Sequence, residues 1–340
     1  MTTTDRISPP RSWMTPDSHF AIAMDSDWYR GLVLLQDTLT TATTQFWTAR
    51  GLRFSHLPIT TGSVSSPMGL GSDSLPVQVD LHGVPTFLAD SMQFSLEYMC
   101  RLSRNGAYYV MPSFRGEAAD PTHLCQFFHS EAEIPGSLDD VMRLVEDYIR
   151  HLAEHLLVQA GHWIARMAGG VAHVESLLAQ PAGFRRLTFD EAVVHLPEPE
   201  SVQTDEVGGW RSLTRAGEKR LMDRLGQFVW VTRWDHLSVP FYQAFDGDGR
   251  ARNADLLFGP GEVVGAGERH TTGDQVRDAL KLHDVASDGY EWYVAMKDLR
   301  PMRTAGFGLG VERFFMWLLQ HDDIRDLQLL PRENGRTILP

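Results

Sequence analysis

The 340-residue chain has few thiols and no long apolar run. Its only cysteines are Cys100 and Cys125, which excludes a disulfide framework and a four-cysteine zinc site. No apolar run approaches the roughly 20 residues that a membrane-spanning helix needs. Residues 1–20 are polar and rich in proline, without the apolar segment of a signal peptide. We therefore expect a cytoplasmic protein that makes no use of a membrane.

Positive charge is also scarce. The chain has 31 Lys and Arg residues against 44 Asp and Glu residues, which gives a formal net charge of −13. A field of this sign opposes long-range attraction to nucleic acid, although a local basic patch remains compatible with it. The hydrophobic content of 43% is ordinary for a globular protein. The length allows one large domain or two.

Signals for helices and strands alternate along the chain. We expect a flexible arm over residues 1–24, a loop over 60–76 and a helical insertion at about 170–225. Apolar periodicity and capping residues predict helices over 25–48, 93–102, 137–160, 189–196 and 272–283. Strands are predicted over 53–58, 77–81, 86–89, 108–114, 124–134, 227–232, 240–245, 255–258 and 262–266. This order indicates one α+β domain over 25–340, with a mixed, mainly antiparallel sheet flanked by helices.

A glycine-rich stretch near the end organises the chain. Residues 306–313 read GFGLGVER, and the apolar run FFMWLL follows. Glycines at a spacing of two favour an extended segment whose bare backbone lets a flat ligand approach. Arg313, at the change from strand to helix, has the forked donors that hold a phosphate. The alternative is a packed strand in which Glu312 and Arg313 form a surface pair.

Two other groups of residues point the same way. Arg115, in the sequence FRGE, precedes a polar loop and Phe127 on the returning strand. An arginine suits a phosphate and an aromatic face suits a nucleobase, although a hairpin with a surface arginine and a core phenylalanine is the alternative. Asp255 and Glu262, on adjacent predicted strands, could bind Mg²⁺ through oxygen. Two solvated acids beside a turn are the alternative there.

Taken together and in this order, these groups resemble motifs 2 and 3 of the class II aminoacyl-tRNA synthetases. The helix over 25–48 and the strand ending at Pro58 resemble motif 1, the dimer-forming element of that family. The similarity extends over about residues 25–332 and narrows to the asparaginyl/aspartyl-tRNA synthetase branch. It is carried there by SMQFSLE (91–97), residues 123–133, PFY (240–242), residues 255–269, YEWY (290–293) and residues 306–325.

The resemblance implies a class II synthetase-like catalytic domain that forms an adenylate from ATP with the help of Mg²⁺. It implies these roles: Arg115 on the α-phosphate, Arg313 on the γ-phosphate, Phe127 stacked on adenine, Glu117 and His123 beside the nucleotide, and Asp255 and Glu262 on Mg²⁺. For the substrate pocket it implies Gln93, Glu97, Glu131 and Arg269, with Arg269 on a side-chain oxygen. The catalytic members of this set are Arg115, Arg313 and Glu262. Leu96, where aspartyl enzymes carry lysine, favours the asparaginyl type, and Glu97 could accept from a carboxamide.

The sequence departs from this pattern in three places. Only about 25 residues precede the motif 1 helix, so we expect a protein without the family's anticodon-binding domain, as in asparagine synthetase-like paralogues. The loop at 60–76 lacks the glutamate that holds the substrate's α-ammonium, unless Asp73 replaces it. The histidine expected before the motif 3 glycines is replaced near Thr304.

We therefore expect a tRNA-independent, ATP-dependent enzyme that adenylates an aspartate- or asparagine-like group. It would act as an amide ligase, on a free, peptide-bound or natural-product substrate, or would activate a carboxamide towards a nitrile. The alternative is a truncated asparaginyl/aspartyl-tRNA ligase or a tRNA-modifying paralogue. A regulatory pseudo-synthetase fits poorly with the intact Arg115, Asp255, Glu262 and Arg313. We expect a homodimer formed through motif 1, and we do not expect tRNA as a partner.

Overall fold

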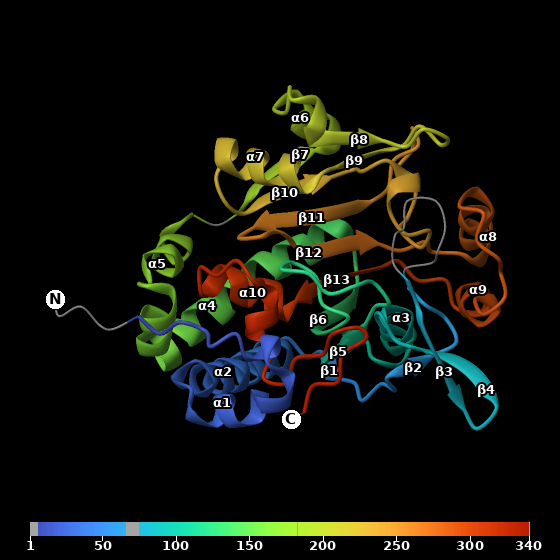
Figure 1. The fold of residues 1–340 in the computed structure, drawn as a ribbon. Coiled ribbons are helices and arrows are strands. Elements are labelled where there is room, and N and C mark those ends of the chain that lie inside the picture. The colour runs from blue at the N-terminus through green and yellow to red at the C-terminus, as the bar shows by residue number, and fades with distance from the viewer. Residues whose placement is uncertain (1–5, 66–74, 182, 340) are drawn as a thin grey trace.

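The computed structural model describes residues 6–65, 75–181 and 183–339, and an eight-stranded sheet runs through its centre (Figure 1). In spatial order the strands are β1 (Arg53–Phe54), β5 (Ala107–Phe114), β6 (Gln126–Pro135), β13 (Thr304–Gly310), β12 (Gly261–Glu268), β11 (Asn253–Phe258), β10 (Val229–Thr232) and β7 (Arg185–Thr188). Only the two outer pairs, β1 with β5 and β10 with β7, are parallel. The predicted mixed, mainly antiparallel sheet is confirmed.

Helices and two small sheets surround the central sheet. The helices are α1 (His19–Asp25), α2 (Asp27–Ala49), α3 (Gln93–Leu102), α4 (Leu138–Ala168), α5 (Ala172–Ala179), α6 (Phe189–Val194), α7 (Arg215–Leu225), α8 (Gly273–Leu282), α9 (Glu291–Leu299) and α10 (Val311–Leu318). The small sheets are β2 (Thr60–Thr61) with β4 (Val84–Leu88) and β3 (Val77–Leu81), and β8 (Val202–Thr204) with β9 (Arg211–Leu213).

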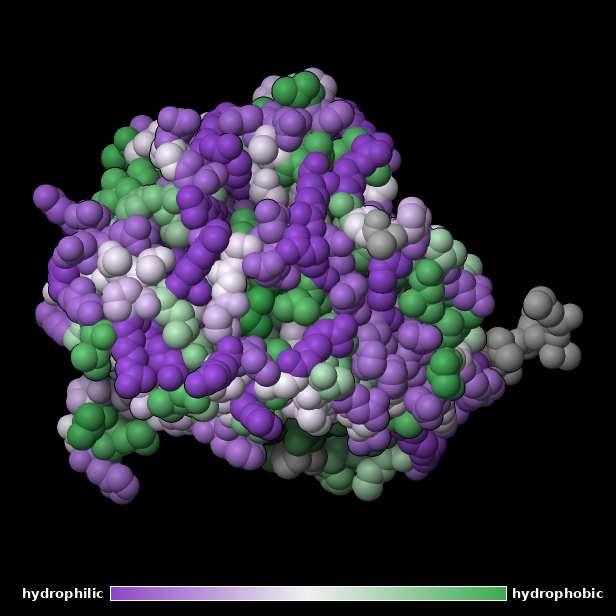
Figure 2. Space-filling model, turned by 180° about the vertical axis from the view of Figure 1, so that it is seen from behind, coloured by the Kyte–Doolittle hydropathy of each residue, from purple (hydrophilic) through white to green (hydrophobic). Residues whose placement is uncertain are grey.

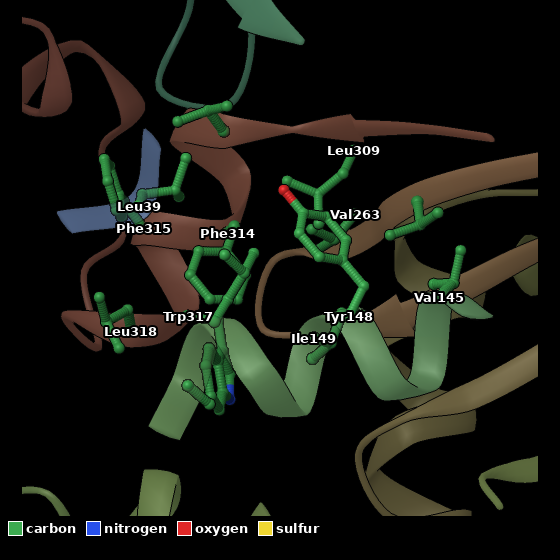
Figure 3. Close-up of a cluster of buried hydrophobic side chains, with 14 of the residues drawn as sticks. Leu39, Val145, Tyr148, Ile149, Val263, Leu309, Phe314, Phe315, Trp317 and Leu318 are labelled. Atoms are coloured by element: carbon green, nitrogen blue, oxygen red, sulfur yellow. The ribbon is translucent and has the colours of Figure 1, made fainter. Parts of the chain in front are cut away.

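One face of the central sheet carries the main core. Alternation along the strands puts Ala132, Val264 and Phe307 on this face, where they are buried in the same cluster as residues of α2, α4 and α10. Figure 3 shows Tyr148 and Ile149 of α4 among the side chains of α10 and the strands. Because side chains alternate across a strand, the intervening residues must point to the opposite face.

The long helices α2 and α4 pack against each other. The hydroxyl of Tyr148 on α4 lies 2.6 Å from Thr43 Oγ1 on α2 and 2.8 Å from Ser130 Oγ on β6. The ring of Phe46 lies 5.2 Å from that of Tyr148. The apolar face of α2, which we expected to need a partner subunit, is therefore covered within the chain.

Most of the described part of the expected flexible arm is folded. Two short 3₁₀ helices (Ser12–Met14 and Pro16–Ser18) lead into α1. Trp13 is buried, and its Nε1 donates to Asp326 Oδ1 at 2.8 Å. His19 is also buried, and its Nδ1 lies 2.9 Å from Ser12 Oγ. The expectation of a flexible arm is wrong over residues 12–24, because contacts with the distant C-terminal segment hold it.

Two other expectations need correction. The strand expected over 240–245 is absent from the described structure, where that segment forms turns with isolated bridges at Gln243 and Phe245. Pro240 begins the segment and has no N–H for a ladder. The insertion over 170–225 is not purely helical, because it also holds β8, β9 and β7, the last of which extends the main sheet beside β10.

Seen from behind, the surface mixes hydrophilic and hydrophobic side chains, with hydrophilic ones more abundant and hydrophobic ones in small groups (Figure 2). In the described ranges, no helix combines the length and the apolar character that crossing a membrane would require.

Candidate active site

The second face of the central sheet bears a row of acids and rings above a floor of glycines. Along β6, alternate side chains Phe127, His129, Glu131 and Glu133 share this face. On β13, Gly308 pairs with Glu131 and Gly306 with Glu133. A Cβ added to Gly306 would lie 1.8 Å from Glu133 Oε2, and one at Gly308 would lie 3.1 Å from Glu131 Oε1. The glycines of the GFGLGVER stretch are therefore required so that the β6 side chains can lie flat across the sheet.

A cleft of about 470 Å³ opens over this face. Six of the residues singled out from the sequence line it together: Arg115, Glu117, His123, Phe127, Glu262 and Arg313. They come from four separate parts of the chain, namely the loop after β5, β6, β12 and α10. The fold thus brings the three groups of residues into one site.

Arg115 and Phe127 face each other at one end of the cleft. The guanidinium carbon of Arg115 lies 5.5 Å from the centre of the Phe127 ring. Arg115 Nε is buried and has no hydrogen-bond partner among the residues that the structure describes. Burying a donor without a partner is costly. This donor is therefore suited to an anionic ligand that would enter the cleft.

Glu117 has a structural contact that the sequence did not indicate. Its Oε1 accepts a hydrogen bond from the backbone N of Leu75 at 2.9 Å, and the backbone N of Gly116 donates to Leu75 O at 2.7 Å. Glu117 therefore fastens the end of the loop at 60–76 to the rim of the cleft. Its Oε2 is buried and without a partner in the described part of the chain.

His123 joins the motif 2 loop to the insertion. Its Nδ1 lies 3.1 Å from Asp120 Oδ2, and Arg215 Nη2 of α7 lies 3.2 Å from the same ring nitrogen. The pKa of Asp120 is lowered, because hydrogen bonds from His123 and Thr122 outweigh the opposing effect of burial. Arg215 was not predicted, because nothing in the sequence indicates that α7 reaches this loop.

Three carboxylates converge at the β11–β12 hairpin. A Cβ added to Gly265 would lie 3.1 Å from Glu262 Oε1 and 3.8 Å from Asp255 Oδ1, so both acids point over this glycine. Glu218 of α7 accepts from the backbone N of Glu262 at 3.2 Å. Burial raises the pKa of Asp255 well above its usual value, and the charges of Glu262 and Glu218 raise it further. Burial and the charge of Glu262 likewise raise the pKa of Glu218 to about 7.

This acid group fits Mg²⁺, a cation that prefers oxygen ligands. A cation near Asp255 and Glu262 would relieve their mutual repulsion. Within residues 6–65, 75–181 and 183–339, no three His, Cys, Asp or Glu side chains are arranged to hold a metal ion by themselves. Protein ligands alone would therefore not complete the shell, which agrees with the usual sharing of Mg²⁺ between carboxylates and phosphate oxygens.

Arg313 and Glu312 do not form a surface pair. Arg313 Nη1 donates to the backbone O of Glu262 at 2.7 Å, which fixes the guanidinium beside the acid group. Glu312 is buried and accepts from the backbone N of Phe128 at 3.0 Å. Burial raises the pKa of Glu312 to about 7, against the smaller effect of that hydrogen bond.

Beyond Glu131 lies a second, more enclosed group of polar residues. Arg269 is buried and donates from Nη2 to Glu133 Oε2 at 3.0 Å and from Nη1 to Gln243 Oε1 at 3.2 Å. Glu131 accepts from Ser91 Oγ at 2.6 Å and from the hydroxyl of Tyr109. The predicted substrate residues Glu131 and Arg269 thus lie on the same face of the sheet, at the end away from Phe127.

Gln93 is the first residue of α3, at this end of the site. Its Nε2 is buried and has no hydrogen-bond partner in the described parts of the chain. Burial raises the pKa of the nearby Tyr242, against smaller opposing effects of Arg269 and Gln93. The placement of Gln93 is compatible with its expected place in a substrate pocket.

The expected role of Glu97 is wrong. Its side chain is fully buried, and its oxygens accept from the hydroxyl of Tyr293 at 2.6 Å and from the ammonium of Lys297. Lys297 also donates to the backbone O of His270 at 2.6 Å. Neither oxygen of Glu97 is open to a carboxamide, because Lys297 of α9 pairs with it in the interior. Neither residue type nor spacing indicates that α9 pairs with α3.

The loop that lacks the expected glutamate has anchors at both sides. Ser65 donates from its backbone N and Oγ to the two carboxylate oxygens of Asp90, at 2.9 and 2.7 Å. Leu75 bonds with Gly116 and Glu117 at the other side. Asp73, the alternative partner for an α-ammonium, lies outside the described residues.

Sequence reasoning assigned no role to His129, Glu133, Glu218, Arg215, Gln243 and Lys297, although Glu133 lies in the stretch 123–133 that it singled out. Only two of these residues could have been placed at the site from a pattern in the sequence. His129 and Glu133 share the period-two alternation of Phe127 and Glu131, so the strand prediction alone places them on the same face. The others reach the site from elements that are distant in the sequence.

The comparisons with known proteins agree with this geometry. The family model "tRNA synthetases class II (D, K and N)" matches residues 21–334. The chain is 28% identical over 268 residues to a probable cytoplasmic asparagine–tRNA ligase of Enterocytozoon bieneusi, covering 76% of this chain and 57% of that protein. It is 29% identical over 321 residues to the asparagine–tRNA ligase of Bacillus anthracis, covering 86% of this chain and 68% of that protein.

Solved structures show the same fold. The asparaginyl-tRNA synthetase of Pyrococcus horikoshii complexed with asparaginyl-adenylate superposes with a TM-score of 0.82 at 22% identity, covering 92% of this chain and 70% of that one. The Entamoeba histolytica enzyme, also with asparaginyl-adenylate, gives 0.80 at 23% identity, covering 97% and 73%. This chain therefore spans between about half and three quarters of these relatives. With the family model matched over most of its length, the chain belongs to the class II tRNA synthetases of the D, K and N branch.

Proposed function

We propose that the chain is an ATP-dependent, adenylate-forming ligase that acts on an asparagine- or aspartate-like carboxylate. The observation that supports this most strongly is the single cleft in which Arg115, Phe127, Glu262 and Arg313 meet over the glycine floor. Relatives named asparagine–tRNA ligases, and neighbours solved with asparaginyl-adenylate, support the same substrate class.

In this reaction, a carboxylate oxygen of the substrate attacks the α-phosphorus of ATP. An oxygen–phosphorus bond forms to the substrate, the bond to the β-phosphate breaks, and pyrophosphate leaves. Phe127 would stack on the base, and Arg115 would hold the α-phosphate with the donor that now lacks a partner. Arg313, fixed beside Glu262, would hold the γ-phosphate. The protein mainly supplies positioning and charge, as is usual for phosphoryl chemistry.

Asp255 and Glu262 would hold Mg²⁺, which, when bound, neutralises charge on the phosphate oxygens. The raised pKa of Asp255 agrees with a site that is incomplete without a cation. Glu218 would stay close to the same cation through its bond to the backbone of Glu262.

An uncharged substrate side chain suits the enclosed end better than a carboxylate. The two cations there, Arg269 and Lys297, are each already paired with a carboxylate, Glu133 and Glu97. A further buried carboxylate would bring an uncompensated charge. This favours an asparagine-like group, with Arg269 as the donor to its side-chain oxygen.

The acidic chain and the altered loop favour a reaction without tRNA. A net charge of −13 opposes binding of a polyanion. The loop at 60–76 contains no glutamate, so a free α-ammonium would enter a closed pocket without its expected partner, at a cost of several kcal/mol in order of magnitude. A substrate whose α-amine is acylated or in a peptide bond avoids that cost. Formation of an aminoacyl-tRNA is the second candidate, because the named relatives are tRNA ligases.

ATP–pyrophosphate exchange tests the proposal. The panel consists of L-asparagine, L-aspartate and their N-acetyl derivatives, each with Mg²⁺. We expect exchange to be fastest with N-acetyl-L-asparagine. Fast exchange with free asparagine, lost in Asp73→Asn, would show instead that Asp73 binds the α-ammonium. Absence of exchange with all four acids would contradict adenylate formation on this substrate class.

A further inference from the structure

We propose that Glu131 and His129 act as a proton-accepting pair, in which Nε2 of His129 takes the proton from an amine that attacks the adenylate. This inference rests on the proposed adenylate formation and names the acceptor class as an amine. It assigns a catalytic role to His129, a residue that neither the motifs nor the composition singled out.

The position of His129 supports this role. It lies on β6 between Phe127, at the expected base site, and Glu131, at the substrate end, and it pairs with Gly310 on β13. Its side chain is 15% exposed and lines the same cleft as Arg115. The imidazole therefore lies between the expected site of the ATP phosphates and the expected site of the substrate carboxylate.

The hydrogen bonds around His129 set its tautomer. Nδ1 lies 3.1 Å from Glu131 Oε1 and 2.9 Å from Ser113 Oγ. The other oxygen of Glu131 already accepts from Ser91 and Tyr109. The pKa of Glu131 is lowered, because hydrogen bonds from His129, Ser91 and Tyr109 and the charge of a protonated His129 outweigh its burial. The donors Ser91 and Tyr109 on its other oxygen favour the carboxylate form.

An ionised carboxylate at 3.1 Å favours a proton on Nδ1, since a bare nitrogen there would place two lone pairs against each other. Nε2 of the neutral ring then carries a free lone pair. No hydrogen bond to Nε2 occurs in the described part of the chain. This is the arrangement of a histidine base that a carboxylate orients.

Most other candidate bases of the cleft are already engaged. Glu262 is directed to the metal site, Glu312 accepts from Phe128, and His123 lies between Asp120 and Arg215. Glu117 keeps an Oε2 without a partner among the described residues, but its expected place is beside the nucleotide base. His129 is therefore the base that lies between the expected phosphate and carboxylate sites.

The transfer step balances as follows. The amine nitrogen attacks the carbonyl carbon of the adenylate, and a carbon–nitrogen bond forms. The bond from that carbon to the phosphate oxygen breaks, and AMP leaves with its electron pair. The extra proton on nitrogen passes to Nε2 of His129, while Nδ1–H continues to donate to Glu131. The imidazolium then releases its proton to solvent.

The test compares two half-reactions in the full chain. Exchange of ATP with pyrophosphate reports adenylate formation, and amide formation with ammonium chloride reports transfer, both with the acid of the panel that exchanges fastest. In His129→Gln we expect the ratio of transfer to exchange to fall by about 100-fold or more, the usual size of general-base effects. Glu131→Gln should lower the same ratio by a smaller factor, and it serves as the test if His129→Gln does not fold.

Two further readouts separate a base from a structural residue. Ammonia, not the ammonium ion, is the nucleophile. The hydroxylamine adduct loses its proton more readily than the ammonia adduct, so transfer to hydroxylamine should fall much less in His129→Gln. The wild-type rate constant of transfer, calculated per free ammonia, should rise with pH to a plateau, and His129→Gln should lose this rise. Glu131 on the same strand contacts the imidazole, and the other titratable or charged groups that line the cleft are Arg115, Glu117, Asp120 and His123 after β5, Glu262 on β12, and Glu312 and Arg313 on α10.

His195→Gln is the control, because His195 is exposed at the end of α6 and lies outside the cleft. A parallel fall of exchange and transfer in His129→Gln would make His129 a binding residue and overturn the proposal. Unchanged transfer would also overturn it. Absence of exchange in the wild type would instead contradict adenylate formation itself, so the two failures are distinguishable.

Discussion

Replacing Glu97 by Gln tests whether this residue belongs to the core or to the substrate pocket. Glu97 and Lys297 are both fully buried and paired, and the Tyr293 hydroxyl also donates to Glu97. Glu97→Gln leaves the ammonium of Lys297 buried without a carboxylate, which typically costs about 3–5 kcal/mol. With an unfolding entropy of about 2 cal/mol/K per residue over 340 residues, Tm should fall by about 4–7 °C.

The assay is thermal unfolding followed by tryptophan fluorescence, together with exchange kinetics across the substrate panel. A double variant, Glu97→Gln with Lys297→Met, removes the unpaired charge and should recover most of the lost Tm. Asp274→Asn is the matched control, because it breaks an exposed pair with Arg277, and exposed ion pairs contribute little to stability. A Tm within about 1 °C of the wild type, with a changed preference between Asn and Asp derivatives, would refute the placement of Glu97 in the core.

Three other predictions follow from the structure. The raised pKa of Glu312, about 7 against about 4.3 in an unfolded chain, means that its contribution to stability is fully present below about pH 4 and is lost as pH rises through 7. The free energy of unfolding in urea should be lower at pH 8 than at pH 5, and Glu312→Gln should remove this difference. The same difference between the two pH values in the variant would refute the burial argument. We also expect a two-fold dimer, because β1 is an edge strand and its Phe54 is 45% exposed. Sedimentation at micromolar concentration should give twice the chain mass, with dissociation in Phe54→Asp, whereas a monomer throughout would contradict it. Finally, total tRNA should not be charged with asparagine or aspartate above a control without enzyme, and charging above that control would favour the second candidate function.

The sheet and the cleft residues could be predicted because their signals are local. Side chains alternate between the two faces of the sheet along β5, β6 and β12, and the glycines of β13 recur at every second position. The helix α3 (Gln93–Leu102) begins and ends at the predicted residues. The segment at 240–245 was mistaken for a strand because its apolar residues pack as turns against α8 and α9. Local pattern cannot distinguish those two outcomes.

Contacts between elements that are distant in the sequence could not be predicted. The partner of Glu97 lies 200 residues away on α9, and the partner of Trp13 lies 313 residues away at Asp326. Such contacts depend on how the whole chain closes, so neither residue type nor spacing indicates them. For the same reason the contacts of α7 were not predicted, namely Arg215 with His123 and Glu218 with the backbone N of Glu262.

The most direct test of adenylate formation in this cleft is ATP–pyrophosphate exchange in Arg313→Ala, compared with the wild type and with Arg143→Ala. Arg143 is exposed on α4 and is not among the residues that line the cleft, so it controls for the loss of an arginine. We predict that Arg313→Ala loses exchange by about 100-fold or more at an unchanged Tm, while Arg143→Ala exchanges at the wild-type rate. Exchange within threefold of the wild type in folded Arg313→Ala would contradict the account.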